Sequence, residues 1–454
     1  MRKLYLILPL ALFVSVGPLS AQEKLVIKGG RILPVSGPAI EGGIVLINKG
    51  KIEAIGKDIP IPADAKVIDA TGKVVVPGFV EAHSTRGMDQ ANETNPIVPF
   101  LSVVDAIDPI QDYFEECRRQ GITTVAIVPG NSTMFGGQAA ILRTAGGFVD
   151  DMLIKRAVGI KLSLRPTGER NRMGHVAAIR RELDAARDTL ADKGKSDEAK
   201  PATGEKANGE PGESAPGVPD TQQRRPRPGG GQRPTGGDAP DATLVREALS
   251  KLLSGEMIAF IYCELAMDVP QAIKLVKDYK LKAVLVLDPD CHKAVKQVAA
   301  AKLPVVLDPT LVFWEIDPRT GEERQVALPK VYRAAGVPVM FQVTGTTSAG
   351  GGRGGGNLPP AVGTNYLWYQ AATAVKYGTP ADEALKAITL GAAQAIGVGD
   401  SRGSIDKGKE ADLVILTGDP LKLDTWVDTT IIGGKVVYER DKDKKLKALL
   451  KPEK

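Results

Sequence analysis

Histidine is the side chain in this sequence with the widest capacity for hydrolytic chemistry, and it is scarce. The 454 residues contain three, His83, His175 and His292. A hydrolytic centre with one or two divalent metals needs several neutral imidazoles converging on one point, with a carboxylate that carries protons. The count therefore excludes any site that requires four histidines.

A second set of reactive side chains falls at or near the ends of predicted strands: Glu81, His83, Glu264, Asp288, Asp290 and His292. Mixed imidazole and carboxylate ligands of this kind could hold one divalent metal. The alternative is that Asp288-Pro289-Asp290 is only a turn, since Asp and Pro favour turns, and that His292 caps the next helix.

The middle of the chain alternates apolar runs with helical stretches. Continuous apolar runs are typical of buried parallel strands. Eight β/α units in succession predict a closed (β/α)8 TIM-like barrel of the α/β class. A doubly wound open sheet is the alternative, weakened because no glycine-rich dinucleotide fingerprint follows the first strand. The predicted strands are 79–83, 124–128, 139–142, 159–164, 258–263, 283–287, 305–307 and 339–343.

Short β runs broken by turns occupy both ends, at 24–76 and again from 413 to 437. This pattern of short strands and turns predicts a small β-sandwich formed by both chain ends. We expect its parts at 22–76 and 401–440, the barrel at 77–400, and a charged tail at 441–454. Residues 191–241, rich in Gly, Pro, Glu, Lys and Ser, are expected to be a disordered insertion in the barrel. The arginines of this insertion could bind an anionic surface, but without interleaved aromatics a solvated linker is the simpler interpretation.

The first 21 residues have the form of a secretory signal peptide. Arg2 and Lys3 precede an apolar stretch, and Ser20-Ala21 precede an expected cut before Gln22. An uncleaved anchor is the alternative, but prolines interrupt the stretch. We expect an exported protein, periplasmic or secreted, with no membrane span after cleavage.

Composition adds two expectations. The net charge of +5 is too slight to imply a nucleic-acid partner. The three cysteines, Cys117, Cys263 and Cys291, are expected to be small buried apolar residues and not a disulfide framework.

The segment Val76-Pro77-Gly78-Phe79-Val80-Glu81-Ala82-His83 resembles the first barrel strand of the amidohydrolase superfamily, which runs Pro-Gly-apolar-apolar-Asp-x-His-x-His. Residues 387–393 and 403–414 resemble the part that closes the barrel and re-enters the sandwich, and 121–125 fits the second strand. The resemblance covers nearly the whole mature chain apart from the insertion. Residues 128–131 and 136–138 loosely favour the imidazolonepropionase-like exported branch.

The resemblance implies metal-dependent hydrolysis of C–N bonds in amides, cyclic amides or dipeptides. The sequence departs from that pattern at most ligand positions. Glu81 replaces the family Asp, Thr85 replaces the second His, and strand eight offers Thr344 and Thr346 where the family has Asp. Strand five ends in Tyr262-Cys263 and strand six in Asp288, without the expected histidines. His83 and Glu81 remain candidate metal ligands, and Lys161 matches the lysine of the fourth strand.

We therefore expect most metal ligands to be missing and the protein to be a non-catalytic binding or partner paralogue. It would take a small-molecule ligand in the barrel mouth and form a homo-oligomer, or a hetero-oligomer with an active relative. The alternatives are an active hydrolase with a rebuilt single-metal site, and a metal-independent enzyme using Tyr262, Cys263 or Lys161. No cofactor is expected or, if any, one divalent metal such as zinc. The expected pocket residues at the barrel mouth are Thr85, Lys161, Tyr262, Cys263, Asp288, Thr344 and Thr346.

Overall fold

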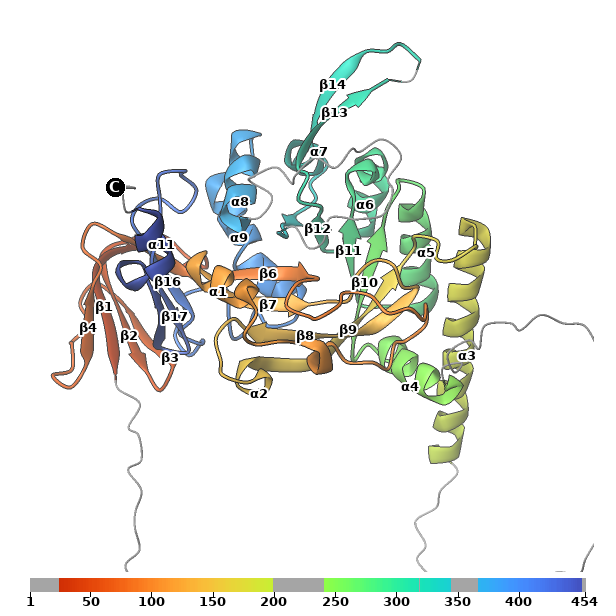
Figure 1. Ribbon diagram of the computed structural model, residues 1–454, viewed down its shortest axis with the longest axis horizontal. Helices are drawn as coiled ribbons and strands as arrows, with labels where there is room; N and C mark the ends of the chain where they lie inside the picture. Colours follow the sequence, from red (N-terminus) through yellow and green to blue (C-terminus); the bar gives the residue numbers. More distant parts are fainter. Residues whose placement is uncertain (1–23, 199–240, 318, 344–365, 451–454) are drawn as a thin grey trace, which may run out of the picture. The chain divides into compact units, whose positions relative to one another are not determined.

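A computed structural model describes residues 24–198, 241–317, 319–343 and 366–450 of the chain (Figure 1). The chain divides into two compact units. One contains the residues up to Val80, Glu115–Thr124 and Pro380 onward, and the other contains Glu81–Phe114 and Val125–Thr379. The expected signal segment, most of the expected insertion, Thr344 and Thr346 lie outside the described residues.

The first unit is built on a sheet that takes strands from both ends of the chain. Its order is β18-β17-β16-β5-β1-β2-β3, with β4 paired to β1. These strands pair into one hydrogen-bonded sheet, whereas the short β runs in the sequence led us to expect the two layers of a sandwich. The strands are β1 (Leu25–Ile32), β2 (Ile40–Asn48), β3 (Lys51–Gly56), β4 (Lys66–Asp69), β5 (Val74–Pro77), β16 (Leu413–Leu416), β17 (Val427–Ile432) and β18 (Lys435–Glu439).

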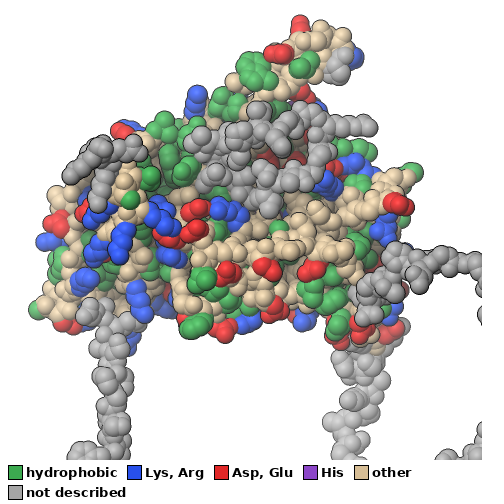
Figure 2. All heavy atoms as spheres, viewed as in Figure 1, with side chains coloured by type: hydrophobic (Ala, Val, Ile, Leu, Met, Phe, Trp, Pro, Cys, Tyr) green, Lys and Arg blue, Asp and Glu red, His purple; other side chains and the backbone are tan. Residues whose placement is uncertain are grey.

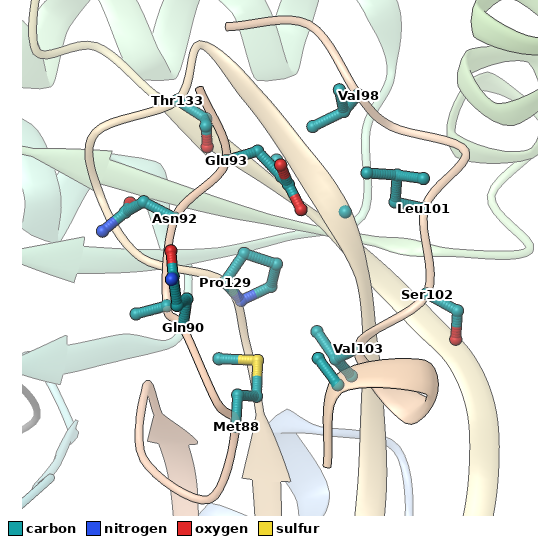
Figure 3. A pocket seen from close by; sticks show the side chains of 14 residues that line it. Met88, Gln90, Asn92, Glu93, Val98, Leu101, Ser102, Val103, Pro129 and Thr133 are labelled. Atoms are coloured by element: carbon teal, nitrogen blue, oxygen red, sulfur yellow. The ribbon is translucent and has the colours of Figure 1, made fainter. Parts of the chain in front are cut away.

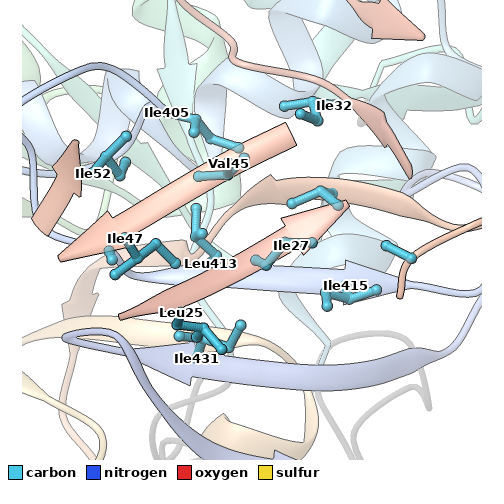
Figure 4. Close-up of a cluster of buried hydrophobic side chains, with 13 residues drawn as sticks. Leu25, Ile27, Ile32, Val45, Ile47, Ile52, Ile405, Leu413, Ile415 and Ile431 are labelled. Carbon is cyan, nitrogen blue, oxygen red and sulfur yellow. The ribbon is translucent and has the colours of Figure 1, made fainter. Parts of the chain in front are cut away.

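Alternate side chains of these strands form one buried apolar cluster (Figure 4). Leu25, Ile27 and Val45 from the N-terminal strands pack with Leu413 and Ile431 from the C-terminal strands. Burial of apolar surface contributes about 25 cal/mol per Å², so this shared core holds the two ends of the chain together. The short helices of this unit are α9 (Ala381–Ala387), α10 (Leu390–Ala395) and α11 (Lys444–Leu449).

A second eight-stranded sheet has the order β15-β12-β11-β10-β9-β8-β7-β6. Its central strands are buried along all or nearly all of their length, as expected for parallel strands covered on both faces. The fold is thus mixed α/β with a nearly closed barrel sheet. The strands are β6 (Phe79–Ser84), β7 (Ile122–Ile127), β8 (Phe135–Arg143), β9 (Leu153–Ser163), β10 (Ile258–Cys263), β11 (Ala283–Leu287), β12 (Val305–Leu307) and β15 (Val339–Met340).

The expectation of eight parallel strands is wrong at β8, which runs antiparallel to β9. Residues 144–152 join these two strands and include only the four-residue helix α2 (Val149–Met152). A parallel crossover needs a dozen residues or more, so a link this short favours an antiparallel pair. Strands β9, β10, β11, β12 and β15 are paired in parallel, and their carboxyl ends meet at one edge.

Helices follow most of the parallel strands (Figure 1). They are α1 (Asp112–Arg119), α3 (Arg172–Glu198), α4 (Ala242–Leu253), α5 (Asp268–Tyr279), α6 (Val295–Ala301), α7 (Leu328–Ala334) and α8 (Leu367–Lys376), with 3-10 turns η1 (Val103–Ala106) and η2 (Pro289–Ala294). In the first unit, the 3-10 turn η4 (Arg440–Lys442) follows β18. Helix α3 continues past residue 191, where we expected the insertion to begin. Among the described residues, no helix is long and apolar enough to cross a membrane.

A hairpin of β13 (Val312–Ile316) and β14 (Glu323–Ala327) projects from the second unit, and hydrophobic side chains are visible on it (Figure 2). On one face, Phe313 packs edge-on against His292. On the opposite face, Trp314 and Ile316 are 63% and 59% exposed. The hairpin is therefore anchored through one face only.

Candidate functional site

The parallel strands bring three of the predicted pocket residues to one edge of the sheet. Lys161 lies on β9 beside Phe260 of β10, and Tyr262 follows two residues later on β10. Asp288 comes directly after β11, and its amide donates to the carbonyl of Cys263 at 3.1 Å. The sequence analysis expected these side chains at the barrel mouth, and the register of β9, β10 and β11 places them next to one another.

His83 is buried, and protein groups contact both of its ring nitrogens. Nδ1 lies 2.6 Å from Oε1 of Gln342, and Nε2 lies 3.2 Å from Nζ of Lys161. Burial and the nearby Lys161 hold the pKa of His83 well below its usual value, so the ring is neutral. A neutral ring with Nδ1–H donating to Gln342 leaves Nε2 as an acceptor for the Lys161 amine.

Lys161 is fully buried on β9. Besides His83, its Nζ lies 5.3 Å from the centre of the Tyr262 ring. Burial lowers the pKa of Lys161 to about 7, and the opposing attraction of Asp288 only partly offsets this. A large fraction of this amine is therefore neutral near neutral pH.

Asp288 and a residue that the sequence analysis did not single out, Asp308, form a pair of carboxyl groups. Leu287 of β11 is in register with Leu307 of β12, and each aspartate follows its leucine directly. The amide of Asp308 donates to the carbonyl of Leu287 at 3.0 Å, and this bond holds the ends of strands β11 and β12 side by side. Burial raises the pKa of Asp288, and the nearby Asp308 raises it further. Burial also raises the pKa of Asp308.

The hydroxyl of Tyr262 donates a 2.5 Å hydrogen bond to Oδ2 of Asp288. This bond favours the ionised carboxylate and opposes the effect of burial on Asp288. Burial and the same Asp288 raise the pKa of Tyr262, so the phenol keeps its proton. Asp288 and Asp308 are half-buried, whereas Tyr262 is 3% exposed, so the carboxyl pair is the part of this cluster that solvent reaches.

Glu81 lies on β6 and is fully buried. Its Oε1 accepts from the amide of Val343 at 3.0 Å, and its Oε2 accepts from the Tyr113 hydroxyl at 3.0 Å. Burial raises the pKa of Glu81 to about 7 against these hydrogen bonds. Together with the contact of His83 to Gln342, Glu81 ties β6 to the chain that follows β15, the two ends of the barrel sheet.

The other candidates lie apart from this cluster or carry little reactivity. Burial raises the pKa of the Cys263 thiol well above its usual range, which disfavours a reactive thiolate. Thr85 is buried, and its hydroxyl has no hydrogen-bond partner among the described residues. Nε2 of His175 lies 2.9 Å from the carbonyl oxygen of Ser163. Nδ1 of His292 lies 2.8 Å from the carbonyl oxygen of Pro289.

The described donors do not fit the metal centre that the family resemblance implies. No group of three or more His, Cys, Asp or Glu side chains within the described ranges is arranged to hold a metal ion. The nitrogens of His83 face Gln342 and Lys161, and both oxygens of Glu81 accept protein hydrogen bonds. A ligand set of several imidazoles does not form here.

The sequence analysis missed Asp308, Gln342 and Tyr113. A signal existed for Asp308, because Leu307-Asp308-Pro309 repeats the pattern Leu287-Asp288-Pro289 at the end of the neighbouring strand. No local signal marks Gln342 or Tyr113, because their roles come from contacts with residues more than 30 positions away.

These features define a barrel protein whose ionisable groups gather at the carboxyl ends of the strands, where barrel enzymes of this architecture carry their chemistry. A sequence profile of the Amidohydrolase family matches residues 374–438. The crystal structure of an amidohydrolase from Thermotoga maritima MSB8 is 25% identical, with a TM-score of 0.70 over 92% of this chain and all of that one. The chain is a member of the amidohydrolase superfamily.

Among curated proteins, the amidohydrolase tasK of Hapsidospora irregularis is 23% identical over 86% of this chain and 39% of its own length. A 5-methylthioadenosine/S-adenosylhomocysteine deaminase of Symbiobacterium thermophilum is 43% identical over a short region, 14% of this chain and 16% of that protein. This chain therefore spans well under two thirds of the length of these relatives.

Proposed function

We propose that this protein hydrolyses C–N bonds of amide type, with the carboxyl pair Asp288–Asp308 as general acid and general base. The observation that carries the proposal is the register of β11 and β12, which sets the two aspartates side by side at the carboxyl end of the barrel strands. Neighbouring carboxyl groups cannot both ionise readily, so one proton is retained between them.

A pair with one proton supplies both halves of the reaction. The ionised carboxylate removes a proton from water as the water oxygen attacks the carbonyl carbon. The protonated partner gives its proton to the leaving nitrogen as the C–N bond breaks. The products are a carboxylic acid and an amine, and proton exchange within the pair restores the starting state. Positioned acid–base catalysis of this kind contributes about 10²- to 10⁴-fold.

The groups around the pair support this assignment. The amide of Thr310 donates to Asp308 at 2.8 Å and lowers the pKa of Asp308, whereas the charge of Asp308 raises the pKa of Asp288, which makes Asp308 the base and Asp288 the acid. The Lys161 amine lies 5.3 Å from the centre of the Tyr262 ring, and its attraction to Asp288 raises the pKa of Lys161 against the effect of burial. We assign Lys161 and His83 to positioning, because both are buried and contact each other at 3.2 Å.

The reaction proposed here runs without a metal ion, since the described donors do not fit the family's metal centre. A paralogue that binds ligands without hydrolysing them was the expectation from the missing histidines. The carboxyl pair favours an active protein over that interpretation, because groups with perturbed pKa values cluster at functional sites.

The test is a hydrolysis screen of the full chain against linear amides, cyclic amides and dipeptides, with products read by mass spectrometry after treatment with a chelator. We expect turnover with at least one class, and a loss of 10²- to 10⁴-fold in kcat/KM in Asp288→Asn and in Asp308→Asn. Asp290→Asn is the matched control, because Asp290 lies on the same loop but accepts from the Ala266 amide and Lys293.

Full activity in both aspartate variants would overturn the assignment of the pair. Absence of turnover in the wild-type chain across all three classes would overturn hydrolysis itself and favour the ligand-binding interpretation. Activity that the chelator abolishes and zinc restores would contradict the metal-free mechanism.

We also propose that the protein is exported, in line with the imidazolonepropionase-like exported branch, and that it forms oligomers. The charged start, the apolar stretch and Ser20-Ala21 support export. The exposed Trp314 and Ile316 on one face of the β13–β14 hairpin support association with another protein chain.

A further inference from the structure

The β13–β14 hairpin contacts the turn η2 through the face that Phe313 and Glu315 share. The ring of Phe313 packs edge-on against that of His292, with 5.7 Å between the ring centres. Oε1 of Glu315 lies 3.0 Å from Nζ of Lys293, and Oε2 of Glu315 lies 3.6 Å from Nε2 of His292. The hairpin follows strand β12, and η2 follows strand β11. These contacts therefore join the chain after one barrel strand to the chain after its neighbour.

A short turn with three hydrogen bonds connects the hairpin to Asp308. The amide of Thr310 donates to Oδ1 of Asp308 at 2.8 Å, and the amide of Leu311 donates to the carbonyl of Pro309 at 2.9 Å. The amide of Leu328 donates to the carbonyl of Leu311 at 2.8 Å and closes the base of the hairpin. Asp308 is therefore fixed relative to the base of the hairpin.

A similar turn connects η2 to Asp288. The amide of Cys291 donates to the carbonyl of Asp288 at 3.0 Å, and Nδ1 of His292 lies 2.8 Å from the carbonyl oxygen of Pro289. The Cys291 thiol donates to the carbonyl of Cys263, at the end of β10, at 3.2 Å. The part of η2 that contacts the hairpin is thus fixed relative to Asp288.

Glu315 is the charged residue at the centre of this contact. It is half-buried, and hydrogen bonds from Arg324 and Lys293 lower its pKa to about 2, so the carboxylate stays ionised at neutral pH. Arg324 lies opposite Glu315 on β14, so that ion pair joins the two strands of the hairpin to each other. Lys293 also pairs with Asp290, three residues earlier in its own turn. Of these three ion pairs, the one between Glu315 and Lys293 is the pair that bridges the two loops.

We propose that Glu315 is a positioning residue that, through Lys293 and His292, sets the spacing of the carboxyl pair Asp288–Asp308. This inference rests on the proposed function of that pair and adds the part of the fold that holds its members together. The repulsion between two like charges falls as their separation grows. A displacement of about 1 Å at a catalytic group can cost about 100-fold in rate. A fixed connection between the two loops therefore affects both the rate and the protonation of the pair.

Glu315→Gln removes the charge and nearly preserves the shape of the side chain. The contact with Lys293 weakens, the two loops separate, and Asp308 then raises the pKa of Asp288 less. We expect the alkaline limb of the kcat/KM profile, which reports the acid Asp288, to move to lower pH, and kcat/KM to fall about tenfold. A purely structural role would reduce the amount of folded protein without moving this limb.

Lys293→Met separates positioning from a direct effect of charge. Through its field alone, removal of the Glu315 anion would lower the pKa of Asp288, whereas removal of the Lys293 cation would raise it. Loss of the connection lowers this pKa in both variants. We expect the double variant to show no further loss, because both substitutions break one contact. Arg324→Gln, which removes only the pair within the hairpin, is the matched control and should leave the profile in place.

Carbon-13 NMR of the aspartate carboxyl groups in the full chain measures the pKa of Asp288 without turnover, with Asp288→Asn assigning the signal. Partly exposed ion pairs contribute little to stability, so we expect both variants to fold, which circular dichroism checks. The expected result is a lower pKa of Asp288 in Glu315→Gln and in Lys293→Met. Displacements of opposite sign in the two variants, or an unchanged pKa in both, would overturn the positioning role. A lower pKa in both variants of a chain that hydrolyses no amide would support the positioning role while the proposed reaction failed.

Discussion

At the scale of single residues, the buried ionisable groups of the barrel form a connected row. Gln342 contacts His83, His83 contacts Lys161, Lys161 lies over the ring of Tyr262, and Tyr262 donates to Asp288. Burial disfavours the charged form of every acid and base in this row. The protonation states of its members are therefore linked to one another and to stability.

Tyr262→Phe tests the link between the phenol and the carboxyl pair. The hydroxyl lowers the pKa of Asp288, so its removal should raise that pKa. The alkaline limb of the kcat/KM profile should move to higher pH, because the acid Asp288 would then keep its proton to a higher pH. The acidic limb, which reports the base Asp308, should keep its position. Tyr279→Phe removes a hydroxyl that bonds to Asp184 on another helix and should leave the profile in place.

Lys161→Met tests the cost of burying the amine. The pKa of Lys161 is about 7 in the folded chain, below its ordinary value of 10.5, so the unfolded chain binds more protons between these two values. The contribution of Lys161 to the free energy of unfolding must therefore rise from about pH 7 to about pH 10.5. Urea unfolding at pH 7 and pH 9 should show wild type gaining about 2 kcal/mol relative to Lys161→Met. If the difference in the free energy of unfolding between wild type and Lys161→Met were the same at both pH values, Lys161 would not be held neutral in the folded chain.

At the scale of elements, the barrel sheet is paired through eight strands, and side chains join its ends. Glu81 and His83 on β6 contact Val343 and Gln342 beyond β15. The sheet of the other unit depends on β16, which pairs with β5 on one side and β17 on the other. Strand β16 therefore connects the C-terminal strands to the N-terminal ones.

Leu413→Ala should show how much this connection contributes to stability. Leu413 is fully buried in the apolar cluster of Figure 4, and its truncation leaves a cavity. We expect the free energy of unfolding to fall by about 2–5 kcal/mol, measured by chemical denaturation. Leu423→Ala, at a leucine that is 68% exposed, should have almost no effect. A loss below 1 kcal/mol in Leu413→Ala would contradict the role assigned to β16.

At the scale of the whole molecule, the question is where the protein works. A leader peptide would be removed on export, and the mature chain would then begin near Gln22. Mass spectrometry of the natural protein, with cell fractionation, should find that terminus outside the cytoplasm. An intact Met1 on a cytoplasmic protein would refute the proposal of export.

The sequence by itself determined the positions of most strands and the superfamily. Runs such as Ile258–Cys263 and Ala283–Leu287 are continuous apolar stretches, and a buried parallel strand needs that pattern wherever it lies. The motif from Val76 to His83 indicated the family, which the comparisons confirmed. Because parallel strands end at one edge, the sequence also predicted that Lys161, Tyr262 and Asp288 would share a site.

Only the tertiary structure decided the direction of β8 and the partners of the ionisable groups. An apolar run has the same pattern in either direction, so the sequence could not show that β8 is antiparallel. Asp308 acquires its raised pKa only by burial beside Asp288, and Gln342 contacts His83 across 259 residues. A shallow hollow lined by the segment after β6 and by the start of β8 (Figure 3) likewise exists only where two separate loops meet. Such contacts depend on register and packing between distant segments, which no local pattern of residues encodes.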